Sequence, residues 1–164
     1  MDFEQLGSLK KVDLTIDGFH LDGDLLKSLA ETDSIVSLDV DSCSMELLAE
    51  ECQRFGDLKS LRVLKLDGHW QNFPREVVEA LAELPKLESL IFDGVGAYHM
   101  GEETFADRLS KLKHLKHLAL NNDGGFQNEI GKELSQLKQL QSLSVRGRQT
   151  VSYTHLTLPT IYSV

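Results

Sequence analysis

A leucine pattern repeats along almost the whole chain and restricts the folds that it can adopt. The pattern Leu-x-x-Leu-x-x-Leu-x-Leu, with other apolar residues or Thr at some positions, occurs in six copies. Successive copies are spaced by 26, 26, 26, 28 and 25 residues, which is too regular for chance. The third position of each copy is Val12, Leu38, Leu64, Leu90, Leu118 and Leu143. A period of this length indicates one strand-and-helix unit per repeat, with neighbouring units stacked on one another.

Each period has a strand-like half and a helix-like half. The Leu-x-Leu end alternates apolar and polar residues, as a strand with one buried face does. The other half has helical spacing, for example Leu48, Cys52 and Phe55 at i, i+4 and i+7. Asp24 is the N-cap expected for the first helix. We expect strands near residues 11–14, 37–40, 63–66, 89–92, 117–120 and 142–145, in one parallel sheet with helices opposite.

This repeat resembles the leucine-rich repeat family, whose signature is Leu-x-x-Leu-x-Leu-x-x-Asn/Cys-x-Leu. The second copy matches it most fully, with Ile35, Leu38, Val40, Cys43 and Met45 at the signature positions. The other copies depart from it at the Asn/Cys position. The resemblance covers residues 3–150, and the helical half is similar to the intracellular repeat classes. It implies an α/β solenoid of about six repeats, a horseshoe segment with a concave parallel sheet and convex helices.

The charge balance argues against some partners. The 164 residues include 26 acidic and 17 basic side chains, so the net charge is −9. Nucleic acids and anionic membranes attract a basic face, and neither is expected as a partner. No apolar run reaches the length of about 18 residues that a membrane span needs. The first residues lack the character of a secretory signal, and the two cysteines show no disulfide spacing, so we expect a cytoplasmic protein.

The composition changes abruptly after Thr150. Residues Val151–Thr160 resemble the in-frame translation of a transposon mosaic-end adapter used in sequencing libraries. The other interpretation is a terminal capping strand, which repeat proteins need. We expect residues 1–150 to be a leucine-rich repeat domain that continues in the natural protein, and residues 151–164 to be a non-native tail.

Few residues suggest catalysis, a cofactor or a metal. His114 and His117 lie near one strand, but metal ligation needs further convergent side chains. Cys43 fits the signature loop and Cys52 a helix core, and a catalytic thiol is the less favoured alternative. The chain is therefore expected to be a non-enzyme without cofactor or metal. Trp70 is a candidate contact residue at the edge of the sheet, although it could instead cover the core.

Polar positions between the strand leucines form the best candidate binding surface. The position directly after the second strand leucine is Thr15 in the first copy and then Asp41, Asp67 and Asp93. Adjacent strands place these aspartates about 5 Å apart, where like charges repel. A solvated face that keeps the sheet soluble is the alternative. The predicted partner-binding residues on the concave face are Asp39, Asp41, Arg62, Lys65, Asp67, Asp93 and Asn121.

These features favour a scaffold or adaptor that binds a protein partner, with a basic segment of that partner on the concave face. Two alternatives remain open. One is a regulator of a switch enzyme, similar to repeat-built GTPase activators. The other is the sensor part of a larger receptor or effector whose other domain is missing.

Overall fold

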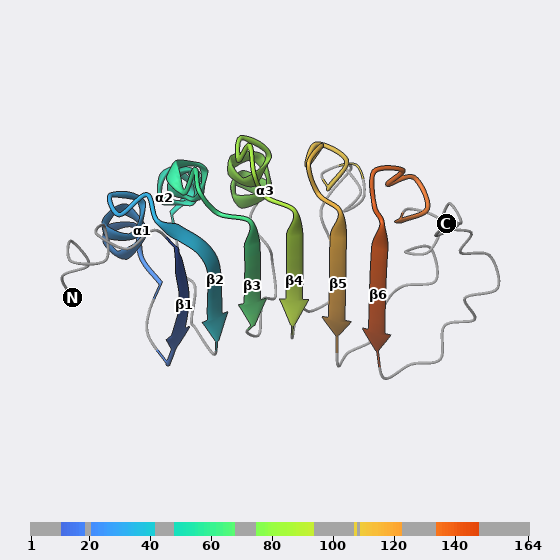
Figure 1. The fold of residues 1–164 in the computed structure, drawn as a ribbon, viewed down its shortest axis with the longest axis horizontal. Helices are drawn as coiled ribbons and strands as arrows, with labels where there is room; N and C mark the ends of the chain where they lie inside the picture. The colour runs from blue at the N-terminus through green and yellow to red at the C-terminus, as the bar shows by residue number, and fades with distance from the viewer. Residues whose placement is uncertain are drawn as a thin grey trace.

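The computed structural model describes residues 11–18, 21–41, 48–67, 75–93, 107, 109–122 and 134–147. Within them the chain forms one six-stranded sheet with the strands in chain order, β1-β2-β3-β4-β5-β6, and every neighbouring pair is parallel (Figure 1). The predicted parallel sheet of an α/β protein is thus confirmed. The strands are β1 Val12–Asp17, β2 Ile35–Asp41, β3 Val63–Asp67, β4 Ser89–Asp93, β5 His117–Asn122 and β6 Ser142–Gly147.

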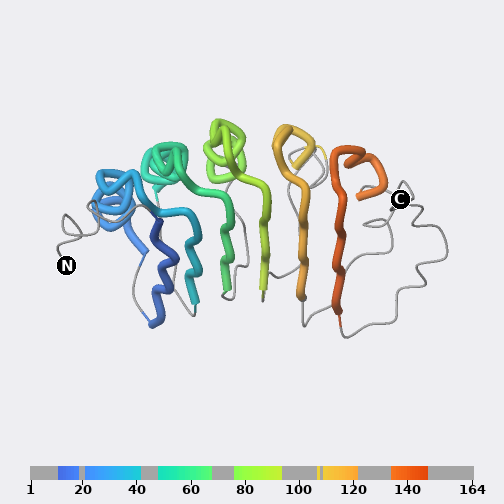
Figure 2. Tube along the Cα trace, viewed as in Figure 1, coloured from blue at the N-terminus to red at the C-terminus, as the bar shows by residue number. Residues whose placement is uncertain are grey.

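Helical segments connect the first four strands. Helix α1, Gly23–Ala30, follows β1, and α2, Ala49–Cys52, continues as the 3₁₀-helix η2, Gln53–Asp57, before β3. Helix α3, Arg75–Ala82, follows β3. Residues of η2 contact α1, α2 and α3, so the helical segments form a second layer in chain order. Figure 2 shows the six strands side by side in chain order.

The leucines of the repeat make the core. In β3, Leu64 and Leu66 are fully buried, and Val63, Lys65 and Asp67 on the other side are partly exposed. The register places Leu38, Leu64, Leu90 and Leu118 side by side on successive strands. Each of these four has an exposed fraction of 2% or less. Successive side chains of a strand point to opposite faces, so the Leu-x-Leu spacing buries one face and leaves the other to polar residues.

The first strand is aligned differently from the sequence prediction. Leu14, not Val12, pairs with Leu38, and Asp17 pairs with Asp41. The predicted alignment was wrong by two residues, and the strand runs on to Asp17. Val12, Leu14 and Ile16 alternate with polar residues, and a shift of two leaves each side chain on the same face. The apolar pattern therefore fits both alignments equally well.

Two predictions about the helices are also corrected. The N-cap of α1 is Asp22, whose Oδ1 accepts a hydrogen bond from the Leu25 amide at 2.8 Å, and Asp24 lies in the first turn. Leu48 was grouped with the buried helical residues Cys52 and Phe55, but it is 62% exposed. It has an extended backbone and is itself the N-cap residue of α2, so the helical spacing does not yet apply there.

Several predictions lie outside the described residues. They concern Trp70, Cys43 and the tail 151–164, including its resemblance to an adapter. In the part of the chain that the structure describes, no helix is long and apolar enough to cross a membrane.

Candidate binding face of the sheet

The face of the sheet turned away from the buried leucines is here called the outer face. Its side chains lie in rows because the parallel strands keep a regular register. The middle row crosses the strands at their centres, and the end row crosses them near their carboxyl ends. The middle row is Thr15, Asp39, Lys65, Ile91, Ala119 and Ser144. The end row is Asp17, Asp41, Asp67, Asp93, Asn121 and Arg146.

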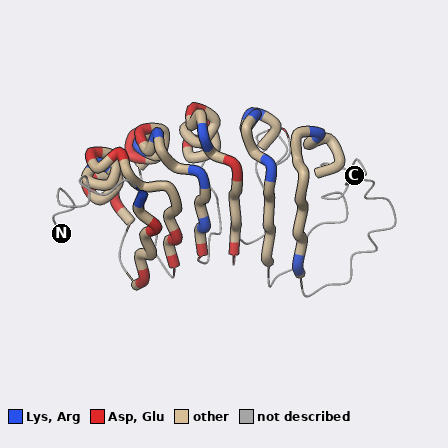
Figure 3. Tube along the Cα trace, in the orientation of Figure 1, with Lys and Arg blue, Asp and Glu red and all other residues tan. Residues whose placement is uncertain are grey.

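The end row begins with four aspartates on four successive strands, here called the acidic row. Asp17 pairs with Asp41, and Asp67 pairs with Asp93. Val40 pairs with Leu66, and these two residues directly precede Asp41 and Asp67, so the register continues across all four aspartates. Figure 3 shows the acidic colour near the ends of the first four strands and a basic residue at the end of β6. The sequence prediction placed Thr15 here and missed Asp17, since only the register of β1 decides between them.

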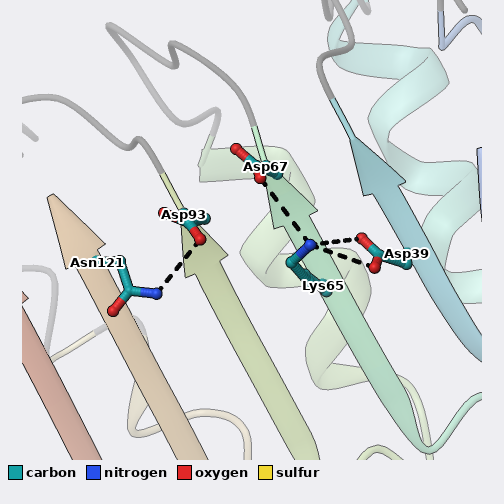
Figure 4. A network of polar contacts seen from close by, with 5 residues as sticks. All are labelled: Asp39, Lys65, Asp67, Asp93 and Asn121. Carbon is teal, nitrogen blue, oxygen red and sulfur yellow. Dashed lines mark hydrogen bonds and ion pairs between the residues drawn. The ribbon is translucent and has the colours of Figure 1, made fainter. Parts of the chain in front are cut away.

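Lys65 is the cation at the centre of this surface. Its Nζ lies 3.1 Å from Oδ1 and 3.2 Å from Oδ2 of Asp39, and 3.9 Å from Oδ2 of Asp67 (Figure 4). Burial lowers the pKa of Lys65, but the hydrogen bond and charge of Asp39 and the neighbouring aspartates outweigh burial and raise it. Lys65 therefore remains charged and holds Asp39 firmly, with a weaker contact to the acidic row.

The carboxylates of the acidic row repel one another. Burial, followed by the charges of Asp93 and Asp41, raises the pKa of Asp67, and Lys65 only partly offsets this. Asp93 accepts a hydrogen bond from the side-chain amide of Asn121 at 3.4 Å, across to β5. Like charges on directly opposite residues destabilise a sheet. A cation placed over this row would relieve that repulsion.

Charges at the other end of the strands are paired with each other. Lys116 Nζ lies 2.6 Å from Glu88 Oε1, and Arg62 lies 3.8 Å from Glu88 Oε2. The hydrogen bond from Lys116 lowers the pKa of Glu88. Arg62 was predicted to be part of the binding surface, but it belongs to this group, five residues before Asp67. The other predicted face residues, from Asp39 to Asn121, do lie together on the outer face.

Two candidates for chemistry, the Cys52 thiol and a metal site, can be compared with the described ranges. Burial and the charges of Glu76 and Glu51 raise the pKa of the Cys52 thiol to about 11, so it is protonated at neutral pH. Among residues the structure describes, no group of three or more His, Cys, Asp or Glu side chains could hold a metal ion. An open groove of about 380 Å³ lies between η2 and α3 in the helical layer, with Asp57, Glu76 and Glu83 in its lining.

Comparisons with known proteins give distant similarity in structure alone. No protein-family profile matches the chain, and no curated protein sequence does. Among solved structures, the chain is similar to one in a crystal structure of a TLR13–ssRNA13 complex, at 16% sequence identity and a TM-score of 0.31. The similarity covers 83% of this chain and 24% of that chain, so this chain spans about a quarter of its length. The function of the outer face is therefore inferred from its own residues.

Proposed function

We propose that the chain is a segment of a leucine-rich repeat solenoid that acts as a scaffold or adaptor and catalyses no reaction. In this proposal the outer face is the concave side, and it binds a basic segment of a protein partner. The observation that carries the proposal is the acidic row, in which four carboxylates lie in register on adjacent strands.

Three features support a binding role over a merely solvated face. The strands hold the side chains at fixed spacing on a paired backbone, so little conformational entropy is lost when a partner binds. The carboxylates of the acidic row repel one another across adjacent strands, and after burial the charges of Asp93 and Asp41 are the next causes of the raised pKa of Asp67; a cationic partner would remove this repulsion. The charges at the start of the strands form ion pairs with one another. A phosphate backbone would meet the acidic row unfavourably, so nucleic acid is not the proposed partner.

The test compares two triple variants that remove the same amount of charge. One variant is Asp41→Ala, Asp67→Ala and Asp93→Ala on the outer face. The control is Glu31→Ala, Glu50→Ala and Asp57→Ala, three exposed residues of the helical layer. The probe is a fluorescein-labelled 16-residue oligolysine peptide, and its Kd is measured by anisotropy at low and high salt.

We expect the outer-face variant to bind at least five-fold more weakly, which corresponds to about 1 kcal/mol. The control should bind like the original chain, and salt should weaken the binding of all three. Equal weakening in both variants would show that only net charge matters and would contradict the proposal. A labelled single-stranded RNA of random sequence is the second probe, and tighter binding of that RNA than of the peptide would also contradict it.

A further inference from the structure

The spacing of the acidic row restricts the conformation of a partner that could use it. Neighbouring strands lie about 4.8 Å apart, so Asp41 and Asp93, two strands apart, are separated by roughly 9.6 Å along the row. Four carboxylates from Asp17 to Asp93 span roughly 14.4 Å. A partner that pairs with each of them must present one cation per strand at close to this interval.

A helix meets this interval better than an extended chain does. One helical turn rises about 5.4 Å, so residues i, i+4, i+7 and i+11 on one face follow four strands with a mismatch of about 2 Å. Lysine and arginine side chains are long enough to absorb such a difference. In an extended segment, residues on one face recur only every 6.6–6.8 Å or so, and the mismatch grows to roughly 6 Å over the same four strands.

The middle row adds an apolar contact beside the acidic row. Ile91 and Ala119 lie on the outer face of β4 and β5, half-buried and next to Asp93 and Asn121 in the end row. On β2 and β3 the same row is occupied by the Asp39–Lys65 ion pair. A helix about 10 Å wide would cover both rows at once, so its basic edge would face the acidic row while its neighbouring face met Ile91 and Ala119.

We propose that the partner segment is a basic amphipathic α-helix that lies across the strands, with one basic side chain per turn over the acidic row and aliphatic residues over Ile91 and Ala119. This inference rests on the proposed function, because it specifies which kind of basic segment the outer face binds.

The experiment uses the full chain and two fluorescein-labelled 18-residue peptides of identical composition, made of Lys, Leu, Ala and Ser. The helical peptide has lysines at i, i+4, i+7 and i+11 and leucines beside them. The extended peptide has the same four lysines at i, i+2, i+4 and i+6. Anisotropy gives the Kd of each, and circular dichroism at 222 nm reports helix formed on mixing.

We expect the helical peptide to bind at least ten-fold more tightly and to gain helical signal when mixed with the chain. Ile91→Asn should weaken its binding at least three-fold, while Ser89→Asn, one position along the same face, should change it little. Double-mutant cycles combine one Lys→Gln change in the peptide with one Asp→Asn change in the chain. The changes in binding free energy should be non-additive for one lysine with each aspartate, and successive lysines should match Asp41, Asp67 and Asp93.

Equal Kd values for the two peptides, or tighter binding of the extended one, would overturn the helix inference. The proposed function would survive that result if the outer-face triple variant still lost affinity for both peptides and the helical-layer control did not. Binding of neither peptide would overturn both. The lysines that couple to Asp41, Asp67 and Asp93 should follow one another in the peptide in the same order as the strands. Any other order would show that the helix does not lie across the sheet and would overturn the inference.

Discussion

At the scale of single residues, the outer face is a balance between one lysine and several aspartates. Lys65 compensates Asp39 at 3.1 Å, but its contact with Asp67 is longer, at 3.9 Å. Burial raises the pKa of Asp67, and the charges of Asp93 and Asp41 raise it further, with only partial compensation by Lys65. The two carboxylates beside this lysine therefore differ, because Asp39 is hydrogen-bonded to it and Asp67 is only in a longer contact.

This difference predicts opposite results for two similar substitutions. Because the pKa of Asp67 is raised in the folded state, protonation of Asp67 stabilises the folded chain. This stabilisation is complete at pH values below the ordinary Asp pKa of 3.8, and it is lost as the pH rises through the pKa of the folded state. At pH 7 the ionised group is a cost, so Asp67→Asn should raise the free energy of unfolding by roughly 0.2–1 kcal/mol. The difference in free energy of unfolding between Asp67→Asn and the original chain should shrink as the pH falls toward 3.8, because Asp67 is then protonated.

The matched control is Asp39→Asn, which removes the main partner of Lys65 and should lower the free energy of unfolding at pH 7. Urea unfolding at pH 7, 5 and 4 measures both variants. A lower stability of Asp67→Asn at pH 7 would mean that its contact with Lys65 outweighs the repulsion within the acidic row.

At the scale of elements, short helical segments depend on a few specific contacts. Helix α1 has only eight residues, too few to be stable alone, so its capping and packing decide whether it forms. Its Leu26 and Leu29 are buried. In η2, Gly56 lies so close to α3 that an added Cβ would be 3.3 Å from the Ala80 carbonyl oxygen. These contacts set the spacing between successive coils.

The N-cap of α1 gives a test at this scale. Asp22→Ala removes the acceptor for the Leu25 amide and should lower the free energy of unfolding by about 1 kcal/mol. Asp24→Ala removes the same charge two residues later, in the first turn. It should lower the free energy of unfolding by only about 0.3 kcal/mol, because a charge there interacts only with the helix dipole. Denaturant unfolding of the two variants should rank them in this order. The reverse ranking would show that Asp24 is the effective cap.

At the scale of the whole molecule, stability comes from stacking of neighbouring strands and coils. Each described strand is hydrogen-bonded to the strands directly beside it in chain order. An interior strand is covered on both sides. In β6, the core-facing Leu143 and Val145 are only partly buried, whereas Leu118 and Leu120 of β5 are 2% and 0% exposed. A leucine at this position should therefore contribute more to the free energy of unfolding in an interior strand than in β6.

Two leucine substitutions test this gradient. Leu90 and Leu143 occupy equivalent positions in the register, through Leu118 between them. Leu90→Ala leaves a cavity in a fully buried site and should cost about 3 kcal/mol. Leu143→Ala should cost less than half as much, because its side chain is already partly exposed. Urea unfolding of both variants measures the difference, and equal losses would mean that the end of the sheet is as well packed as its centre.

The sequence by itself determined most of the core and most of the outer face, with Leu48 and Asp17 as exceptions. The leucine spacing placed all six strands correctly in order, since burial of one strand face demands that alternation. It also identified Asp39, Asp41, Lys65, Asp67, Asp93 and Asn121 as neighbours on one surface, because a constant period brings equivalent positions together in a parallel sheet.

The tertiary structure decided what depends on register and on individual contacts. A shift of two residues preserves every buried side chain, so only the pairing of β1 with β2 placed Asp17 in the acidic row and moved Thr15 out of it. The sequence also could not tell that Lys65 bonds Asp39 more closely than Asp67, or that Arg62 pairs with Glu88. The Lys65–Asp39 and Arg62–Glu88 pairs join residues 26 positions apart, about one period, and their distances are set by how the coils stack.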